Sequence, residues 1–170
     1  MLHGLGFGQS NILYRGTGGP WDIDPLVEVW NNENDRSDLV NLGTAFIAPA
    51  QGQRPLTAGS PLRNSAFVQC LSAIAAARNE SVRGVLSGKG GQGVGTWYAS
   101  SARQANLLRA IAVADASGVT KFDFVIMALG ESDDTLSLST AIPRYNAVFR
   151  ELGTEGLIDC IIEFCCENAD

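Results

Sequence analysis

The segment FDFVIMALGESD, residues 122–133, joins a long apolar run to a polar end. Apolar side chains fill all but one position of residues 122–129, a pattern typical of a buried strand. The next four residues, Gly-Glu-Ser-Asp at 130–133, stop the run. The segment therefore predicts a buried strand that delivers a polar loop at its carboxyl end.

Strand-like and helix-like segments alternate along the rest of the chain. Apolar runs predict strands at residues 1–7, 26–30, 45–47, 83–87, 122–129 and 157–164. Helical spacing of apolar residues predicts helices at 65–78, 101–116 and 139–152. The alternation predicts parallel βαβ units and a three-layer α/β sandwich with a mostly parallel sheet. Residues 16–64, rich in Gly, Pro, Asn and Asp, are predicted to form an elaborate surface loop with only short strands.

The helical spacing also predicts which side chains face the sheet. In the first helix these are Phe67, Leu71, Ile74 and Ala75. In the second they are Leu107, Leu108, Ile111 and Ala112. In the third they are Ile142, Tyr145, Val148 and Phe149, and Pro143 is expected in the first turn.

Length and composition limit the class of protein. The chain has 170 residues, enough for one domain with a core, so we expect a single domain over residues 1–170. Eighteen acidic against 12 basic residues give a net charge of -6, which argues against a nucleic-acid-binding surface. No apolar run approaches the roughly 18 residues of a membrane span, and no signal peptide is visible.

Histidine and cysteine usage limits the chemistry. The one histidine, His3, excludes a metal site with several histidine ligands. The cysteines are Cys70, Cys160, Cys165 and Cys166, and no Cys-x-x-Cys occurs among them. Cys70 and Cys160 are predicted to be small buried hydrophobes. We therefore expect no metal.

Three polar or glycine-rich motifs follow predicted strands. They are Gly-Gln-Ser-Asn at 8–11, Gly-Gly-Gln-Gly-Val-Gly-Thr-Trp at 90–97 and Gly-Glu-Ser-Asp at 130–133. Because ligands bind at the carboxyl ends of parallel strands, these motifs are expected to converge on one functional edge. Ser10 has the setting of an exposed nucleophile, although a serine after glycine also suits a plain turn. The third motif suits substrate positioning, or a simple cap of the next segment.

The glycine-rich motif has two nucleotide-binding interpretations, and both are disfavoured. Residues 88–93 fit Gly-x-Gly-x-x-Gly, but no apolar helix follows immediately and no acidic residue ends a next strand. A phosphate-binding loop of the ATPase kind needs a lysine where Val94 stands. We therefore expect no nucleotide cofactor.

Together, the motifs resemble those of the SGNH-hydrolase superfamily, and in particular its sialate O-acetylesterase-like, or carbohydrate esterase family 6-like, group. That group carries Gly-Gln-Ser-Asn, then Gly-Gly-Thr-x-Ile-x-x-Trp, then Gln-Gly-Glu-Ser-Asp. The first block is complete here, the second has Gln92 for the threonine, and the third has Leu129 for the leading glutamine. The resemblance covers nearly the whole chain and implies an SGNH/flavodoxin-like α/β domain.

The resemblance also implies roles for individual residues. Ser10 would be the nucleophile, and the amides of Ser10 and Gly91 would hold the oxyanion. Leu129 cannot supply the side-chain donor that usually completes that site. The residues implied in substrate binding are Gln9, Asn11, Gly90, Glu131, Ser132 and Asp133. No metal and no other cofactor is implied.

The resemblance lacks the family's final Asp-x-x-His block, whose histidine activates the serine. His3 is a poor substitute, because seven residues of extended strand would place it about 23 Å from Ser10. We therefore expect a domain that is incomplete at its C-terminus, with the histidine on a downstream segment or a second polypeptide. A serine without such a base is a weak nucleophile.

Two functions follow as expectations. The first is a serine esterase that removes O-acetyl groups from carbohydrate through Ser10. The second is a non-catalytic glycan-binding or structural module, in a surface or virion assembly, that descends from such an esterase. Trp21, Trp30 and the Asn31-Asn32 pair would serve sugar stacking, a subunit contact or plain scaffold, and Trp97 is expected to pack beneath the pocket. An extracellular or surface-associated location is favoured over a cytoplasmic one.

Overall fold

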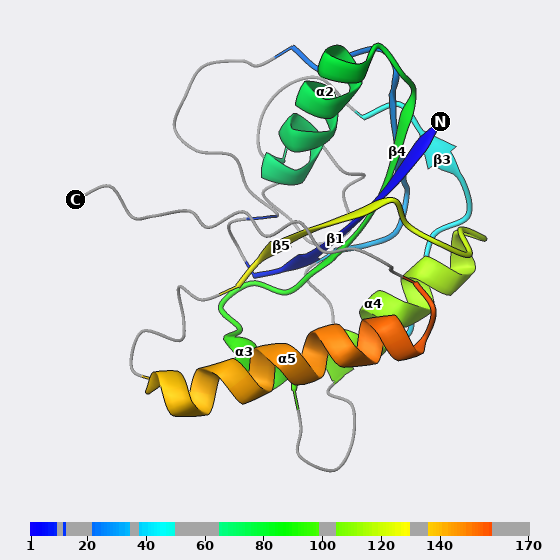
Figure 1. Cartoon of the computed structure of the whole chain (residues 1–170). Helices are drawn as coiled ribbons and strands as arrows, with labels where there is room; N and C mark the ends of the chain where they lie inside the picture. Colours follow the sequence, from blue (N-terminus) through cyan, green and yellow to red (C-terminus); the bar gives the residue numbers. More distant parts are fainter. Residues whose placement is uncertain are drawn as a thin grey trace.

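The computed structural model describes residues 1–9, 12, 22–34, 38–49, 65–98, 105–129 and 136–157. Its strands are β1 (Leu2–Gly8), β2 (Val27–Trp30), β3 (Phe46–Ile47), β4 (Val82–Gly88) and β5 (Phe124–Ala128). Its helices are α2 (Ala66–Arg78), α3 (Val94–Trp97), α4 (Ala105–Ala116) and α5 (Leu138–Thr154). Figure 1 shows how they are arranged.

The strands of this part of the chain form one mixed sheet in the order β3-β2-β4-β1-β5. β1 pairs in parallel with both β4 and β5, and β2 pairs in parallel with β4. The short β3 is antiparallel to β2. β1, the first strand, therefore lies inside the sheet, between the two strands that precede the other two motifs.

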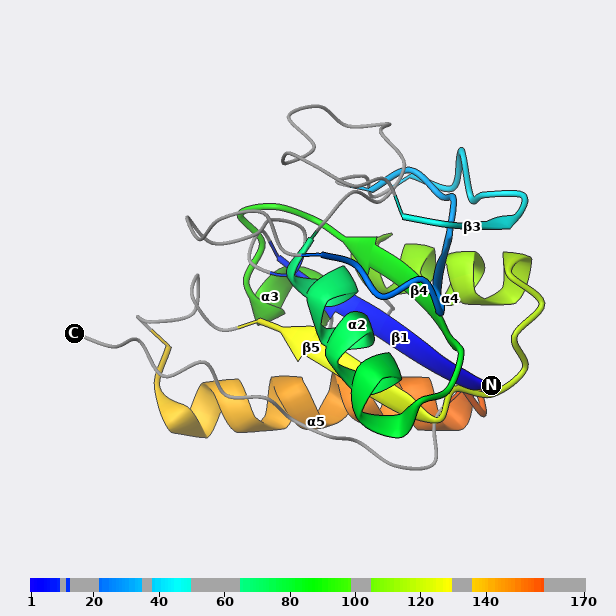
Figure 2. The ribbon, with the colours of Figure 1, turned by 90° about the horizontal axis from the view of Figure 1, so that it is seen from above.

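Helices cover both faces of the sheet, which makes three layers (Figures 1 and 2). On one face α2 packs its Phe67 and Leu71 against strand residues such as Val29 and Leu86. On the other face side chains of α3, α4 and α5 pack against Leu5, Val85 and others. The predicted three-layer α/β sandwich with a mostly parallel sheet is confirmed.

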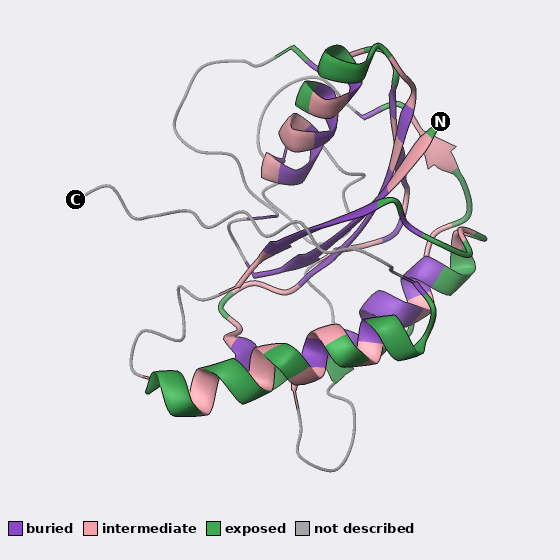
Figure 3. Ribbon diagram, viewed as in Figure 1, coloured by how far each residue is buried: buried purple, intermediate pink, exposed green. Residues whose placement is uncertain are grey.

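Glycines in β1 and β4 allow α2 to lie close to the sheet. A Cβ built on Gly6 would lie 2.6 Å from the ring of Phe67, and one on Gly84 would lie 2.3 Å from a methyl carbon of Leu71. Both distances are shorter than side chains allow. The missing side chains therefore make room for the buried helix residues (Figure 3).

The predicted element boundaries agree with the structure to within a few residues. Ser65 caps α2, because its side chain accepts a hydrogen bond from the N–H of Val68, and Asn79 ends that helix in the left-handed conformation. The one-turn helix α3 was not predicted. The predicted strand at 157–164 lies outside the described residues except for Leu157, whose carbonyl accepts from the N–H of Phe122 at 2.9 Å.

Two predicted helix faces need correction. Leu108 is 38% exposed, whereas Arg109 beside it is 1% exposed, so α4 is rotated from the predicted orientation. Ile142 is 54% exposed, because α5 buries Val148 and Leu152 instead. Pro143 lies in the second turn of α5 rather than the first. Because proline has no N–H, the carbonyl of Ser139, four residues earlier, loses its helical donor. Ser139 is exposed, so water can reach that carbonyl.

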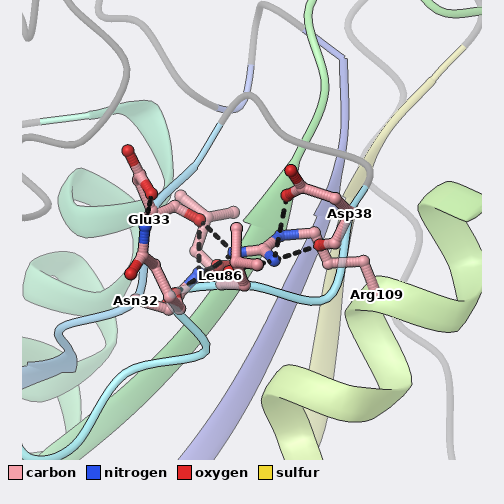
Figure 4. A network of polar contacts seen from close by, with 7 residues as sticks. Asn32, Glu33, Asp38, Leu86 and Arg109 are labelled. Atoms are coloured by element: carbon pink, nitrogen blue, oxygen red, sulfur yellow. Dashed lines mark hydrogen bonds and ion pairs between the residues drawn. The ribbon is translucent and has the colours of Figure 1, made fainter.

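The buried charge of Arg109 is compensated through the two terminal nitrogens of its guanidinium. Its guanidinium donates hydrogen bonds to backbone carbonyls in the segment 33–41, and Figure 4 shows this network. The acceptors are the carbonyls of Glu33, Asp38, Val40 and Asn41. A side chain of α4 therefore fixes a loop that follows β2.

Candidate active site

The chain connections after β1 and β4 mark a topological switch point, and the space beyond the carboxyl ends of these two strands is called the crevice below. After β1 the chain crosses to the face of α2, where Ile12 is buried in the core. After β4 it crosses to the opposite face, where Val94 and Trp97 are buried with α4 and α5. In parallel α/β sheets, ligands bind where two neighbouring strands send their chains to opposite faces. The topology therefore places the candidate site between the carboxyl ends of β1 and β4.

The three strands that precede the motifs have matching register positions at their carboxyl ends. Gly8 is the register partner of Gly88 in β4 and of Ala128 in β5. The motif positions Ser10, Gly90 and Gly130 each come two residues after one of these register partners. This register agrees with the convergence of the motifs on one edge.

Hydrogen bonds tie the ends of the three strands together. The N–H of Gln9 donates to the carbonyl of Ala128 at 2.8 Å, and the N–H of Lys89 donates to the carbonyl of Gly8 at 2.9 Å. Gly8 has a φ of +149° that favours glycine. The segment that leads to Ser10 is therefore held between the two neighbouring strands.

The predicted site residues divide into two groups. Ser10, Asn11, Glu131, Ser132 and Asp133 lie outside the described residues, so their roles stay predictions. Gln9, Gly90 and Gly91 are described. The side chain of Gln9 is 2% exposed, and its Oε1 atom has no hydrogen-bond partner in the described part of the chain. Gln9 is therefore buried directly after the carboxyl end of β1.

Gly91 has the geometry of an open turn. Its φ of +65° lies in the left-handed region, and no heavy atom comes within 4 Å of the position that a Cβ would occupy. Gly91 is exposed, whereas Val94, three residues later, is buried. The backbone of Gly91 is therefore accessible at the crevice, as an amide donor needs to be.

Trp97 packs in the core a few residues after the glycine-rich turn. It is 1% exposed, and its ring lies 5.6 Å from that of Phe7, measured between centroids. It belongs to α3, which begins directly after the glycine-rich turn. The predicted packing role of Trp97 is confirmed.

Other predicted sugar contacts belong to the scaffold. Trp30 is buried, and its Nε1–H donates to the carbonyl of Leu42 at 2.6 Å. Asn31 accepts from the N–H of Thr44 at 2.6 Å and orders the turn before β3. Trp21 lies outside the described residues. Of the three roles left open for Trp30 and Asn31, the contacts favour scaffold.

Two asparagines continue the sheet where β2 ends. The side chain of Asn32 donates to the carbonyl of Leu86 at 2.8 Å, and the side-chain oxygen of Asn34 accepts from the N–H of Gly88 at 3.2 Å. These side chains take the place of strand pairing along β4. Sequence reasoning missed Asn34 because an asparagine in a polar loop gives no periodic signal.

His3 lies at the far end of the sheet from the crevice. It is near the start of β1, and its N–H donates to the carboxylate of Asp123 at 2.7 Å. Its Nδ1 atom lies 4.0 Å from the same carboxylate. The strand geometry therefore agrees with the prediction that His3 cannot reach the residues after Gly8.

Among the described residues, no group of three or more His, Cys, Asp and Glu side chains is placed to hold a metal ion. No helix in the same residues has both the length and the apolar character needed to cross a membrane. Cys70 forms no disulfide within the described residues and is partly buried beside the α2 core, somewhat more exposed than predicted.

The fold defines a three-layer α/β protein with a mostly parallel sheet. The solved structure of NanS resembles it with a TM-score of 0.50 and 16% sequence identity. The match covers 91% of this chain and 63% of the NanS chain, so the chain spans less than two thirds of that protein. No family model and no curated protein matches the sequence. The likeness to NanS shows the shared fold.

Proposed function

We propose that the chain is a serine-esterase-like domain that removes O-acetyl groups from carbohydrate. The observation that carries the proposal is the topological switch point between the paired strands β1 and β4, because Ser10 follows one strand and Gly91 follows the other. The motif resemblance adds the reaction class. NanS is a sialate O-acetylesterase, and the likeness of fold is compatible with a carbohydrate esterase.

The proposed reaction is acyl transfer in two steps. The Oγ of Ser10 attacks the acetyl carbonyl carbon, and the amides of Ser10 and Gly91 hold the resulting oxyanion. The bond to the sugar oxygen breaks, that oxygen takes up a proton, and the acetyl group stays on Ser10. Water then attacks the acetyl-serine, which releases acetate and restores the hydroxyl.

The proton transfers need a general base that these residues do not supply. His3 lies at the opposite end of the sheet, bonded to Asp123. The proposal therefore includes a histidine from a downstream segment or from a second polypeptide. That histidine would take the proton of Ser10 and return it to the leaving sugar oxygen.

A non-catalytic module is the second candidate. Leu129 and Gln92 replace a glutamine and a threonine of the family blocks, and the one histidine of the chain is far from the crevice. A domain that has lost its base would keep the crevice for glycan binding or serve as a structural part of a surface assembly. Both candidates use the same edge of the sheet.

Labelling with an active-serine phosphonate separates the two candidates. We expect rapid modification of the protein isolated from its native source, mapped to Ser10 by peptide mass spectrometry and abolished in Ser10→Ala. A complete esterase of the same group is the positive control. No modification of Ser10, under conditions that label the control, would favour the binding module.

The intact mass of the same preparation locates the base. A polypeptide longer than 170 residues directs the search to its additional segment. A polypeptide of 170 residues that is labelled at Ser10 requires a histidine from another chain, which co-purification then identifies. A polypeptide of that length without labelling contradicts the esterase proposal.

A further inference from the structure

A groove lies along α2, on the side of that helix that faces the segment leading into β2. It has a volume of about 540 Å³, which is within the range of small-ligand sites. Residues 22–25 form one wall of the groove, and residues 69–76 of α2 form the other. The groove is large enough for a small organic molecule.

The groove lies at the other end of the sheet from the crevice. The carbonyl of Asp24 accepts a hydrogen bond from the N–H of Val27, the first residue of β2, at 3.0 Å. Because β2 is parallel to β4, this amino end of β2 points away from the edge where the three motifs follow their strands. α2 also covers the face of the sheet opposite to α3, α4 and α5 (Figure 1). The groove is therefore separate from the candidate active site.

A hydrogen bond joins the two walls of the groove. The N–H of Asp24 donates to the Oγ of Ser72 at 3.1 Å, and the Oδ1 of Asp24 accepts from the N–H of Leu26 at 2.8 Å. Between the two aspartates of this wall, Ile23 is buried in the core beside α2. The walls are therefore held in place before a ligand arrives, which lowers the ordering cost of binding.

The two walls differ in chemistry. The wall at 22–25 carries the carboxylates of Asp22 and Asp24, and no basic side chain of the described residues forms an ion pair with either of them. The wall of α2 includes the methyl groups of Ala73 and Ala76, both of which are exposed. No basic residue is among the described residues that line the groove. A negative and an apolar surface side by side favour a ligand that is both cationic and apolar.

We propose that this groove is a second ligand site, which takes a small organic cation with an ammonium group on an apolar body. The ammonium group binds at the wall that carries Asp22 and Asp24, and the apolar body packs on Ala73 and Ala76. The proposal goes beyond the esterase function, because the groove uses none of the motif residues. Labelling of Ser10 by the phosphonate is a separate measurement, so either proposal can fail while the other stands.

A nuclear magnetic resonance titration of the ¹⁵N-labelled protein tests the proposal. The probe is 4-phenylbutylammonium, and the matched control is 4-phenylbutan-1-ol, which has the same apolar body without the charge. We expect saturable shifts of the amides of residues 22–24 and 69–76, with a Kd on the order of 1 mM for the ammonium. The alcohol should bind about fivefold more weakly at low salt, and this difference should shrink at high salt because exposed charges are screened.

Two alanines of α2 provide a matched pair of variants for the shape of the groove. Ala73→Leu places a larger side chain in the groove and should weaken binding of the ammonium by about tenfold or more. Ala77→Leu makes the same change at an exposed residue of the same helix that does not line the groove, and should leave the affinity unchanged.

Aspartate variants test the recognition of charge. Asp22→Asn and Asp24→Asn should each reduce the preference for the ammonium over the alcohol, and the double variant should bind the two probes equally. The asparagine at position 24 can still accept the hydrogen bond from Leu26. Asp115→Asn removes an exposed carboxylate of α4, on the other face of the sheet, and should leave the preference intact.

Equal binding of ammonium and alcohol by the parent protein would overturn the proposal, as would a lack of saturable shifts at the groove or full affinity in Ala73→Leu. A peptide, acetyl-Leu-Lys-Leu-amide, that binds about tenfold more tightly than the ammonium would replace the small cation with a basic protein segment. Groove signals of the free protein that shift on dilution would replace it with a second copy of the chain. Thermal unfolding of each variant checks that the fold is retained.

Discussion

Gly8 lies so close to Ala128 that a Cβ on Gly8 would stand 2.2 Å from the carbonyl oxygen of Ala128. The same carbonyl accepts the hydrogen bond from the N–H of Gln9. The last residue of β1 therefore has to be glycine for the chain to turn toward Ser10 while it remains bonded to β5.

Gly8→Ala should lower the free energy of unfolding by more than about 2 kcal/mol, because the new methyl group meets backbone that cannot move aside. Gly118→Ala is the control: Gly118 also has a positive φ, of +72°, but open space surrounds its Cβ position. That control should cost only about 1 kcal/mol. Urea unfolding of the two variants measures both, and equal losses would contradict the close contact.

Arg109→Met should destabilise the protein by about 3 kcal/mol, because four carbonyls of the segment 33–41 lose their donor. Arg150→Met changes an exposed arginine and should stay within about 0.5 kcal/mol of the parent. Hydrogen exchange should show faster exchange of amides in 33–41 in the first variant only. Unchanged exchange there would mean that Arg109 does not hold the loop.

The fold was predictable from the sequence because its strands are runs of apolar residues and its helices carry apolar residues at helical spacing. Residues 124–127 of this run are buried because β5 receives cover from both helical layers. The orientation of α4 was not predictable, because burial of Arg109 depends on carbonyls about 70 residues earlier in the chain. A prediction from the helical spacing of apolar residues alone places an arginine on the exposed face of the helix.

For the candidate site, the sequence predicted that three motifs follow neighbouring parallel strands. β1, β4 and β5, which precede these motifs, do lie side by side in the sheet. That a ligand binds at this edge stays a prediction. Asn34 carried no signal, because it acquires its role from a hydrogen bond with a distant segment, the N–H of Gly88. Ser10, on which the chemistry depends, lies outside the described residues, so its role stays a prediction.

Trp97→Ala should cost about 3–5 kcal/mol of stability, because it empties a buried site beneath the crevice. Trp97→Phe keeps the contact with Phe7 and should cost less. Neither change should alter carbohydrate affinity beyond what unfolding explains, which calorimetry on the folded Phe variant checks. Weaker sugar binding by Trp97→Phe at unchanged stability would instead identify Trp97 as a sugar-stacking residue.

His3→Gln should leave the rate of phosphonate labelling at Ser10 unchanged, because His3 lies at the start of β1 and the crevice lies beyond its end. The backbone N–H of residue 3 can keep its bond to Asp123 in the variant. A fall in labelling of about tenfold or more, at unchanged stability, would show that His3 serves as the base after all.

Gly91→Ala tests the proposed oxyanion donor. Gly91 has a φ of +65°, and the space around its Cβ position is open, so the new methyl group meets no atom. An alanine is strained at this φ, however. We expect the turn to change and the backbone amide of residue 91 to move. We expect labelling of Ser10 to slow by about tenfold or more, because a misplaced donor stabilises the developing oxyanion less. Gly156→Ala is the control, because Gly156 has a similar φ of +71° and equally open space around its Cβ position. This variant should show a similar small loss of stability and no change in the labelling of Ser10. Equal labelling rates for the two variants would remove Gly91 from the proposed mechanism.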